Sequence, residues 1–204
     1  MSSRDATVDA YETDAAAYAV NGAFMPDSVR RDIEDLVARL GRGARVLEVG
    51  SGGGRDARLM EHLGLRVRRT DITPAFVTLL REQGHDADVI DPLRDDLGSP
   101  DGAYDAVWAN ASLLHVARTD LPTVMARLAE VTRSGGFLRM SVKEGDGEGW
   151  STHGSISNPR HFTYWRADPL REVVAGAGWN DVEITSQVDS RAGQPWLEVL
   201  AVRA

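Results

Sequence analysis

A short glycine-rich loop carries the clearest chemical signal in the 204-residue chain. It follows the apolar segment 45–49 and comprises Gly50, Ser51, Gly52, Gly53 and Gly54. Glycines let the backbone turn sharply and approach a ligand closely, and the amides that open the following helix favour a negative group. Asp71 ends the next strand-like segment, 21 residues after Gly50, where a carboxylate can accept hydrogen bonds from a ribose diol. The spacing predicts a site for a nucleoside-containing ligand.

Two ligand classes fit this loop. The run from Gly52 to Ala57 satisfies the G-x-G-x-x-G/A pattern of dinucleotide-binding proteins. Glu48 argues against a dinucleotide, because a carboxylate two positions before the first glycine favours a positively charged ligand over a pyrophosphate. We also expect the chain to end too soon for a separate catalytic domain, and its last two strands to differ from a second mononucleotide-binding half. A small NAD(P)-dependent oxidoreductase therefore stays as the alternative.

Candidate catalytic groups follow the fourth and fifth strand-like segments of the chain, 104–109 and 137–142. His115 lies just beyond the fourth, and an imidazole could take a proton from a hydroxyl or amine nucleophile. The other interpretation is a wall histidine with satisfied hydrogen bonds. Lys143 and Glu144 end the fifth segment, where either one faces the substrate or the two pair at the surface.

Aromatic residues gather in and beside the Gly- and Ser-rich segment 143–163, which is predicted to be a mobile loop. Trp150, Tyr164 and Trp165 could roof a pocket for a flat apolar substrate, or could simply pack this loop onto the sheet edge. The acidic run 86–101 is interpreted as a solvated loop, so no metal site is expected.

The composition narrows the function classes. The chain has 23 basic and 31 acidic side chains, and the formal net charge of −8 argues against a nucleic-acid or anionic-membrane binder. The absence of cysteine excludes disulfides, thiolate metal sites and cysteine nucleophiles. The chain has neither an apolar run of about 18 residues nor the apolar core of a signal peptide, so we expect a cytoplasmic enzyme or binding protein.

The order of the predicted elements defines the fold class. Helical spacing occurs over 7–20 and about 26–40, before the glycine loop. Strand-like segments then alternate with helical ones, the strands being 45–49, 65–70, 87–90, 104–109 and 137–142. This alternation predicts a mainly parallel sheet covered on both faces. The last two strands, 182–184 and 196–202, have no helix between them and are predicted to be an antiparallel edge pair.

From residue 44 to 204 the chain resembles the class I S-adenosylmethionine-dependent methyltransferases. The resemblance rests on an ordered set of motifs: VLEVGSGGGRDA, RRTDITPAF, DADVIDP, YDAVWANASLLHV, SGGFLRMSVKEG and FTYWRADPLREVVAGAGW. It is greatest to small, stand-alone proteins of the broad methyltransferase-domain group, whose substrates vary widely. It implies an α/β, Rossmann-like, doubly wound seven-stranded sheet. Residues 1–204 would form a single domain, with 1–43 as a helical lid segment and 44–204 as the core.

The resemblance also implies roles for individual residues. Those lining the methionine part of S-adenosyl-L-methionine would be Glu48, Gly50, Gly52, Gly54 and Asn110, and Ser51 would also belong to the cofactor site. Asp71 would bind the ribose and Ile72 would pack on the adenine, whose amino group would donate to Asp91 or, alternatively, Asp88. Tyr11 and Tyr18 lie in the N-terminal helix, which in many relatives closes over the cofactor.

The implied reaction is an in-line displacement that converts the cofactor to S-adenosyl-L-homocysteine. Because the sulfonium is already activated, the protein mainly aligns the nucleophile and excludes water, and positioning of this kind can supply roughly 7–11 kcal/mol of a barrier. Segments 7–24 and 143–163 would form the lid. The acceptor is expected to be a small molecule; a non-catalytic sensing domain is the other alternative, and monomer and homodimer are both left open.

Overall fold

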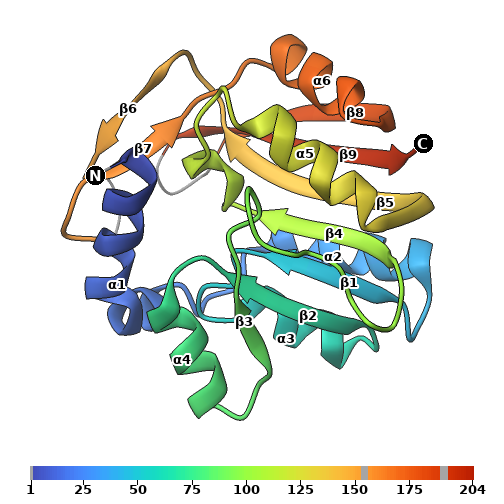
Figure 1. The fold of residues 1–204 in the computed structure, drawn as a ribbon, viewed down its shortest axis with the longest axis horizontal. Coiled ribbons are helices and arrows are strands. Elements are labelled where there is room, and N and C mark those ends of the chain that lie inside the picture. The colour runs from blue at the N-terminus through green and yellow to red at the C-terminus, as the bar shows by residue number, and fades with distance from the viewer. Residues whose placement is uncertain (1, 153–155, 189–192) are drawn as a thin grey trace.

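The computed structural model describes residues 2–152, 156–188 and 193–204, and its central feature is a seven-stranded sheet in the order β3-β2-β1-β4-β5-β9-β8 (Figure 1). Its strands are β1 (Arg45–Val49), β2 (Arg66–Asp71), β3 (Ala87–Val89), β4 (Tyr104–Asn110), β5 (Thr132–Lys143), β8 (Trp179–Val188) and β9 (Pro195–Arg203). The helices are α1 (Ser3–Asn21), α2 (Asp27–Leu40), α3 (Arg55–His62), α4 (Pro74–Glu82), α5 (Leu121–Glu130) and α6 (Ala167–Gly176). A 3-10 turn, η1, spans Leu113–His115.

Side chains from the central strands alternate between two apolar layers. In β1, Val46 packs with α2 and α3, whereas the next residue, Leu47, packs with α5 and α6. Both side chains are fully buried, as expected for a strand of a parallel sheet that is covered on both faces. Figure 1 shows α5 and α6 on one face of the sheet and α2 and α3 on the other.

The predicted fold class is confirmed. Strands β1 to β5 pair in parallel, and β9 runs antiparallel to both β5 and β8 at the edge. Because β1 to β5 run in the same direction, the carboxyl ends of β1, β2 and β4 lie together, beside the glycine loop. Among the described residues, no helix has both the length and the apolar character needed to cross a bilayer.

Two expectations about the elements are wrong. Within the segment 143–163, β6 (Glu148–Ser151) and β7 (Arg160–Thr163) form a separate antiparallel sheet, although 153–155 lie outside the described residues. Its four-residue strands are too short to show a clear alternation in the sequence, and β7 is buried against α1 and η1 instead. In addition, β5 begins at Thr132 rather than at 137, because Thr132 pairs with Tyr104 before the register shifts.

Candidate active site

A cavity of about 220 Å³ lies at the carboxyl ends of β1, β2 and β4. It lies where open α/β sheets bind ligands. Helix α1 covers it, and the cavity brings together eight of the residues predicted from the sequence: Tyr11, Tyr18, Gly50, Gly52, Asp71, Ile72, Asp91 and His115. Contacts between α1 and both α4 and β7 hold this helix in place. The N-terminal segment and the glycine loop therefore enclose the same space.

The glycines of the loop are required mainly by close packing. Gly50 has a φ of 79°, and a Cβ atom there would lie 2.3 Å from Cβ of Ser112. At Gly54, with a φ of 73°, a Cβ atom would lie 2.5 Å from Leu80. Gly52, with a φ of 51°, borders the cavity. Because it has no side chain, its backbone can approach a ligand there closely. Gly54 itself does not line the cavity and serves the packing of α3 on α4.

Asp71 joins the loop to the cavity. Its Oδ2 accepts a hydrogen bond from the Gly52 amide at 2.8 Å, and its Oδ1 accepts one from the Thr73 amide at 2.8 Å. The side chain is buried, and burial raises the pKa of its carboxyl above the ordinary value despite these donors. Each carboxylate oxygen can accept more than one hydrogen bond, so both retain capacity for a ligand in the cavity.

Glu48 lies beneath the loop rather than at the cavity. It is 2% exposed, and its Oε2 accepts a hydrogen bond from Oγ of Ser51 at 2.5 Å. Burial, together with the nearby carboxylate of Asp56, raises the pKa of Glu48 to about 8. The Glu48 and Ser51 side chains therefore brace the loop from below.

Asp56 is a buried residue that sequence reasoning missed. Its Oδ2 accepts hydrogen bonds from Nε1 of Trp108 at 3.0 Å and from Nδ2 of Asn110 at 2.8 Å. Oγ of Ser141 donates to Oδ1 of Asn110 at 2.7 Å, so the amide of Asn110 is held on both sides and does not border the cavity. A signal existed, since Asp56 is the second residue of the helix that follows the glycine loop.

His115 faces the cavity as a neutral imidazole with a defined tautomer. Its Nδ1 lies 2.6 Å from the carbonyl oxygen of His161, and a carbonyl can only accept, so Nδ1 carries the proton. Nε2 is then an acceptor, and the hydroxyl of Tyr11 donates to it at 2.9 Å. Burial lowers the pKa of His115 to about 3.

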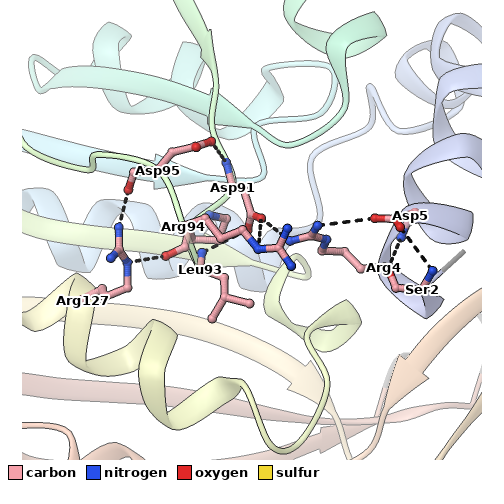
Figure 2. A network of polar contacts seen from close by, with 9 residues as sticks. Ser2, Arg4, Asp5, Asp91, Leu93, Arg94, Asp95 and Arg127 are labelled. Atoms are coloured by element: carbon pink, nitrogen blue, oxygen red, sulfur yellow. Dashed lines mark hydrogen bonds and ion pairs between the residues drawn. The ribbon is translucent and has the colours of Figure 1, made fainter.

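Asp91 links the loop after β3 to helix α1, as Figure 2 shows. Its Oδ1 accepts a hydrogen bond from the Leu93 amide at 3.0 Å, and its Oδ2 forms an ion pair with Arg4 of α1. Arg94 lies 3.9 Å from the same carboxylate. Asp88, the alternative adenine partner, pairs instead with Arg68 and does not border the cavity. Sequence reasoning missed Arg4, because it lies 87 residues from its partner.

Aromatic contacts and one carboxylate also hold α1 over the site. Tyr11 and Tyr18 lie with their ring centroids 5.4 Å apart, and both contact the ring of Phe76 in α4. Oε2 of Glu12 accepts a hydrogen bond from the Ala75 amide, in the first turn of α4, at 3.0 Å. These contacts make α1 a cover that is fixed to the rim of the cavity.

The remaining candidate residues lie outside this cavity. Trp165 is buried beneath the guanidinium of Arg118, whose Cζ is 4.0 Å from the ring centroid. Trp150 is 53% exposed, and Tyr164 is partly buried. Lys143 is 7% exposed and contacts the ring of Phe162. Within the described part of the chain, no cluster of His, Asp and Glu side chains could hold a metal ion.

The fold and this site define a class of protein. The strand order, the single antiparallel strand next to the edge, and a glycine loop with an acid at the end of β2 are the features of the class I methyltransferase fold. Residues 47–140 match the family model described as a methyltransferase domain. This match covers slightly less than half of the chain, and together with the fold it makes the chain similar to the class I S-adenosylmethionine-dependent methyltransferases.

Curated relatives match about half of the chain. A sarcosine/dimethylglycine N-methyltransferase of Halorhodospira halochloris is 32% identical over 122 residues, which are 55% of this chain and 43% of the relative. A ubiquinone biosynthesis O-methyltransferase of Xanthomonas axonopodis pv. citri is 34% identical over 116 residues, 54% of this chain and 48% of the relative. The matched region thus spans less than half the length of either relative.

Solved structures share the fold over the whole chain. The 1,6-didemethyltoxoflavin-N1-methyltransferase of Burkholderia thailandensis, solved with 1,6-didemethyltoxoflavin and S-adenosylhomocysteine, has a TM-score of 0.74 at 22% identity. That match covers 100% of this chain and 92% of the other. The magnesium protoporphyrin IX methyltransferase of Synechocystis PCC 6803, solved with bound SAH, has a TM-score of 0.76 at 14% identity and covers all of both chains.

Proposed function

We propose that this protein transfers a methyl group from S-adenosyl-L-methionine to a small-molecule acceptor. The observation that carries the proposal is the buried carboxylate of Asp71, which holds the Gly52 amide and borders the same cavity as Tyr11 and His115. A nucleoside and a reacting group would thus lie under one cover. Residues 1–204 act as one domain, in which the segment 1–43 includes the cover.

The residues present fit the cofactor. Asp71 has acceptor capacity left on both oxygens for the two ribose hydroxyls. Ile72 and Phe76 give the cavity an apolar wall beside Asp71, suited to the adenine ring. Asp91 lies at the rim, where its carboxylate can accept from the adenine amino group. The relatives solved with S-adenosylhomocysteine support this choice of cofactor.

Catalysis rests on positioning and on the exclusion of water. The bound cofactor supplies an activated methyl group. Helix α1 closes the cavity, and its Tyr11 hydroxyl is fixed by Nε2 of His115. A base with a pKa of about 3 provides little driving force for proton removal near neutral pH. We therefore infer that His115 holds Tyr11 in place. The proton of the acceptor would then pass to solvent or to a group other than His115.

Calorimetry with S-adenosylhomocysteine and, in parallel, NADH tests the proposal. We expect binding of S-adenosylhomocysteine and none of NADH, and we expect Asp71→Ala to weaken the former by at least tenfold. Asp88→Ala is the matched control, because Asp88 is a carboxylate on the neighbouring strand that does not border the cavity. Binding of NADH alone would instead support the oxidoreductase alternative, and unchanged affinity in Asp71→Ala would remove the ribose assignment.

A further inference from the structure

Lys143 is the single lysine of the chain; the other 22 of the 23 basic side chains are arginines. Lysine is among the residues least often buried, because its ammonium is strongly hydrated. Lys143 is nevertheless 7% exposed, at the carboxyl end of β5. Burial of the only lysine in the chain therefore indicates that Lys143 has a specific role.

In the described part of the chain, no negative charge compensates the ammonium of Lys143. Its Nζ lies 3.9 Å from the ring centroid of Phe162, and Cζ of Arg160 lies 5.2 Å from the same centroid. Among residues 2–152, 156–188 and 193–204, no carboxylate forms an ion pair with Lys143 and no acceptor binds its ammonium. A ring face offsets only part of the cost of burying a cation. Burial and the charge of Arg160 accordingly lower the pKa of Lys143.

Lys143 and Arg160, the two cations on the Phe162 ring, lie away from the end of the cavity that would bind the nucleoside. In the sheet order, β5 lies two strands from β1, which is roughly 10 Å at the usual strand spacing. Phe162, which both cations contact, lies with its ring centroid 4.7 Å from that of His115. Arg160 also donates to the Tyr11 hydroxyl at 3.2 Å. Neither cation lines the cavity itself, but through Phe162 and Tyr11 both adjoin His115 and Tyr11, which do.

We propose that Lys143 and Arg160 form a carboxylate-binding subsite, and that the carboxylate belongs to the methyl acceptor rather than to the cofactor. The inference rests on the proposed function and narrows its substrate class to small carboxylic acids. Two cations on one aromatic ring attract an anion, and a carboxylate placed between them would supply the hydrogen-bond acceptors that the ammonium of Lys143 lacks. The neighbouring rings of Tyr11, His115 and Phe162 favour an acid with a flat body.

The single lysine makes the test specific. Protein grown with [6-¹³C]lysine gives one ε-carbon signal, which is followed with S-adenosylhomocysteine present in excess. The probes are benzoate, 4-hydroxybenzoate and 2-aminobenzoate, each paired with its uncharged primary amide. We expect at least one acid to shift the signal in a saturable way and to bind at least tenfold more tightly than its amide. If none of the three acids shifts the signal, the subsite is refuted.

Lys143→Met supplies the second arm. Methionine keeps the unbranched apolar stem up to Cε and removes the buried ammonium, so the variant should fold with an unchanged or raised melting temperature. Ligand-detected NMR should show the preference for the acid reduced at least tenfold. Arg171→Met is the control, since Arg171 is an exposed cation of α6 that pairs with Asp168. Retention of the preference in Lys143→Met overturns the proposal.

A third arm separates the acceptor from the cofactor, whose methionine end also carries a carboxylate. S-adenosylhomocysteine is compared with 5′-methylthioadenosine, which lacks that end. We expect Lys143→Met to leave both affinities within twofold of those of the parent protein. A selective loss for S-adenosylhomocysteine assigns the subsite to the cofactor and overturns the acceptor assignment. Failure of S-adenosylhomocysteine to bind the parent protein refutes the proposed function itself.

Discussion

The hydroxyl of Tyr11 donates to Nε2 of His115 across 104 positions of the chain, and this bond ties the covering helix α1 to the turn η1 after β4. The direction of the bond is fixed, because the carbonyl of His161 occupies Nδ1 on the other side of the ring. One imidazole therefore connects α1, η1 and β7. Helix α1 is thus joined to the site that it covers by a hydrogen bond between two neutral groups, Tyr11 and His115.

Removal of the Tyr11 hydroxyl should destabilise the protein. Tyr11→Phe leaves a buried imidazole acceptor without its donor, which costs about 1–3 kcal/mol. Urea denaturation followed by tryptophan fluorescence measures the loss. Tyr18→Phe is the matched control on the same helix, because no hydrogen bond of the Tyr18 hydroxyl is present among the described residues. Equal losses in the two variants would show that the bond to His115 contributes nothing specific.

Asp91 and Asp88 should differ in their effect on cofactor affinity. Asp91 borders the cavity, whereas Asp88 pairs with Arg68 outside it. A hydrogen bond to a charged acceptor contributes about 1.5–3 kcal/mol, so Asp91→Asn should weaken S-adenosylhomocysteine binding by about tenfold or more. Asp88→Asn should leave it within twofold. The reverse order, measured by calorimetry, would transfer the adenine contact to Asp88.

Arg4 should restrain the first turn of α1. Its ion pair with Asp91 joins the helix to the loop after β3, and the carboxylate is only 13% exposed. Hydrogen exchange measured by mass spectrometry should show faster exchange near the start of α1 in Arg4→Met, by up to about fivefold for a pair worth ~1 kcal/mol. Arg94→Met removes a more distant cation from the same carboxylate and should change little. Equal exchange in both variants argues against a restraint by Arg4.

Glu48 should make stability fall as pH rises. Its pKa of about 8 lies above the ordinary value of 4.5, so between these limits the folded protein holds a proton that the unfolded chain has lost. The contribution to stability is complete below about pH 4.5 and is lost as pH rises through about 8, with a slope of at most about 1.4 kcal/mol per pH unit. Glu48→Gln keeps an acceptor for Ser51 and removes this slope.

Urea denaturation of the parent protein and Glu48→Gln at pH 5, 6, 7 and 8 tests this sign. The free energy of unfolding of the parent protein, relative to the variant, should decrease from pH 5 to pH 8. Glu130→Gln, which alters an exposed carboxyl in α5, provides the comparison for a surface change. Parallel curves for the parent protein and Glu48→Gln would contradict a buried, protonated Glu48.

Local patterns predicted the main elements but not the small sheet. The apolar segment before Gly50 has the predicted bounds, 45–49, because its burial follows from the apolar run within the segment itself. Strands β6 and β7 are each four residues long, and β7 is buried by α1 and η1 rather than by a local pattern. Asp56 was missed for a similar reason, since its partners come from β4.

The sequence by itself determined the parallel sheet, the loop at the end of β1 and the position of Asp71, because periodicity and glycine placement act over a few residues. Only the tertiary structure decided that Arg4 meets Asp91, that Tyr11 meets His115, and that Lys143 is buried beside Arg160. These encounters depend on how α1 and β7 dock on the sheet. Docking is set by packing between segments far apart in the chain, and no local pattern encodes it.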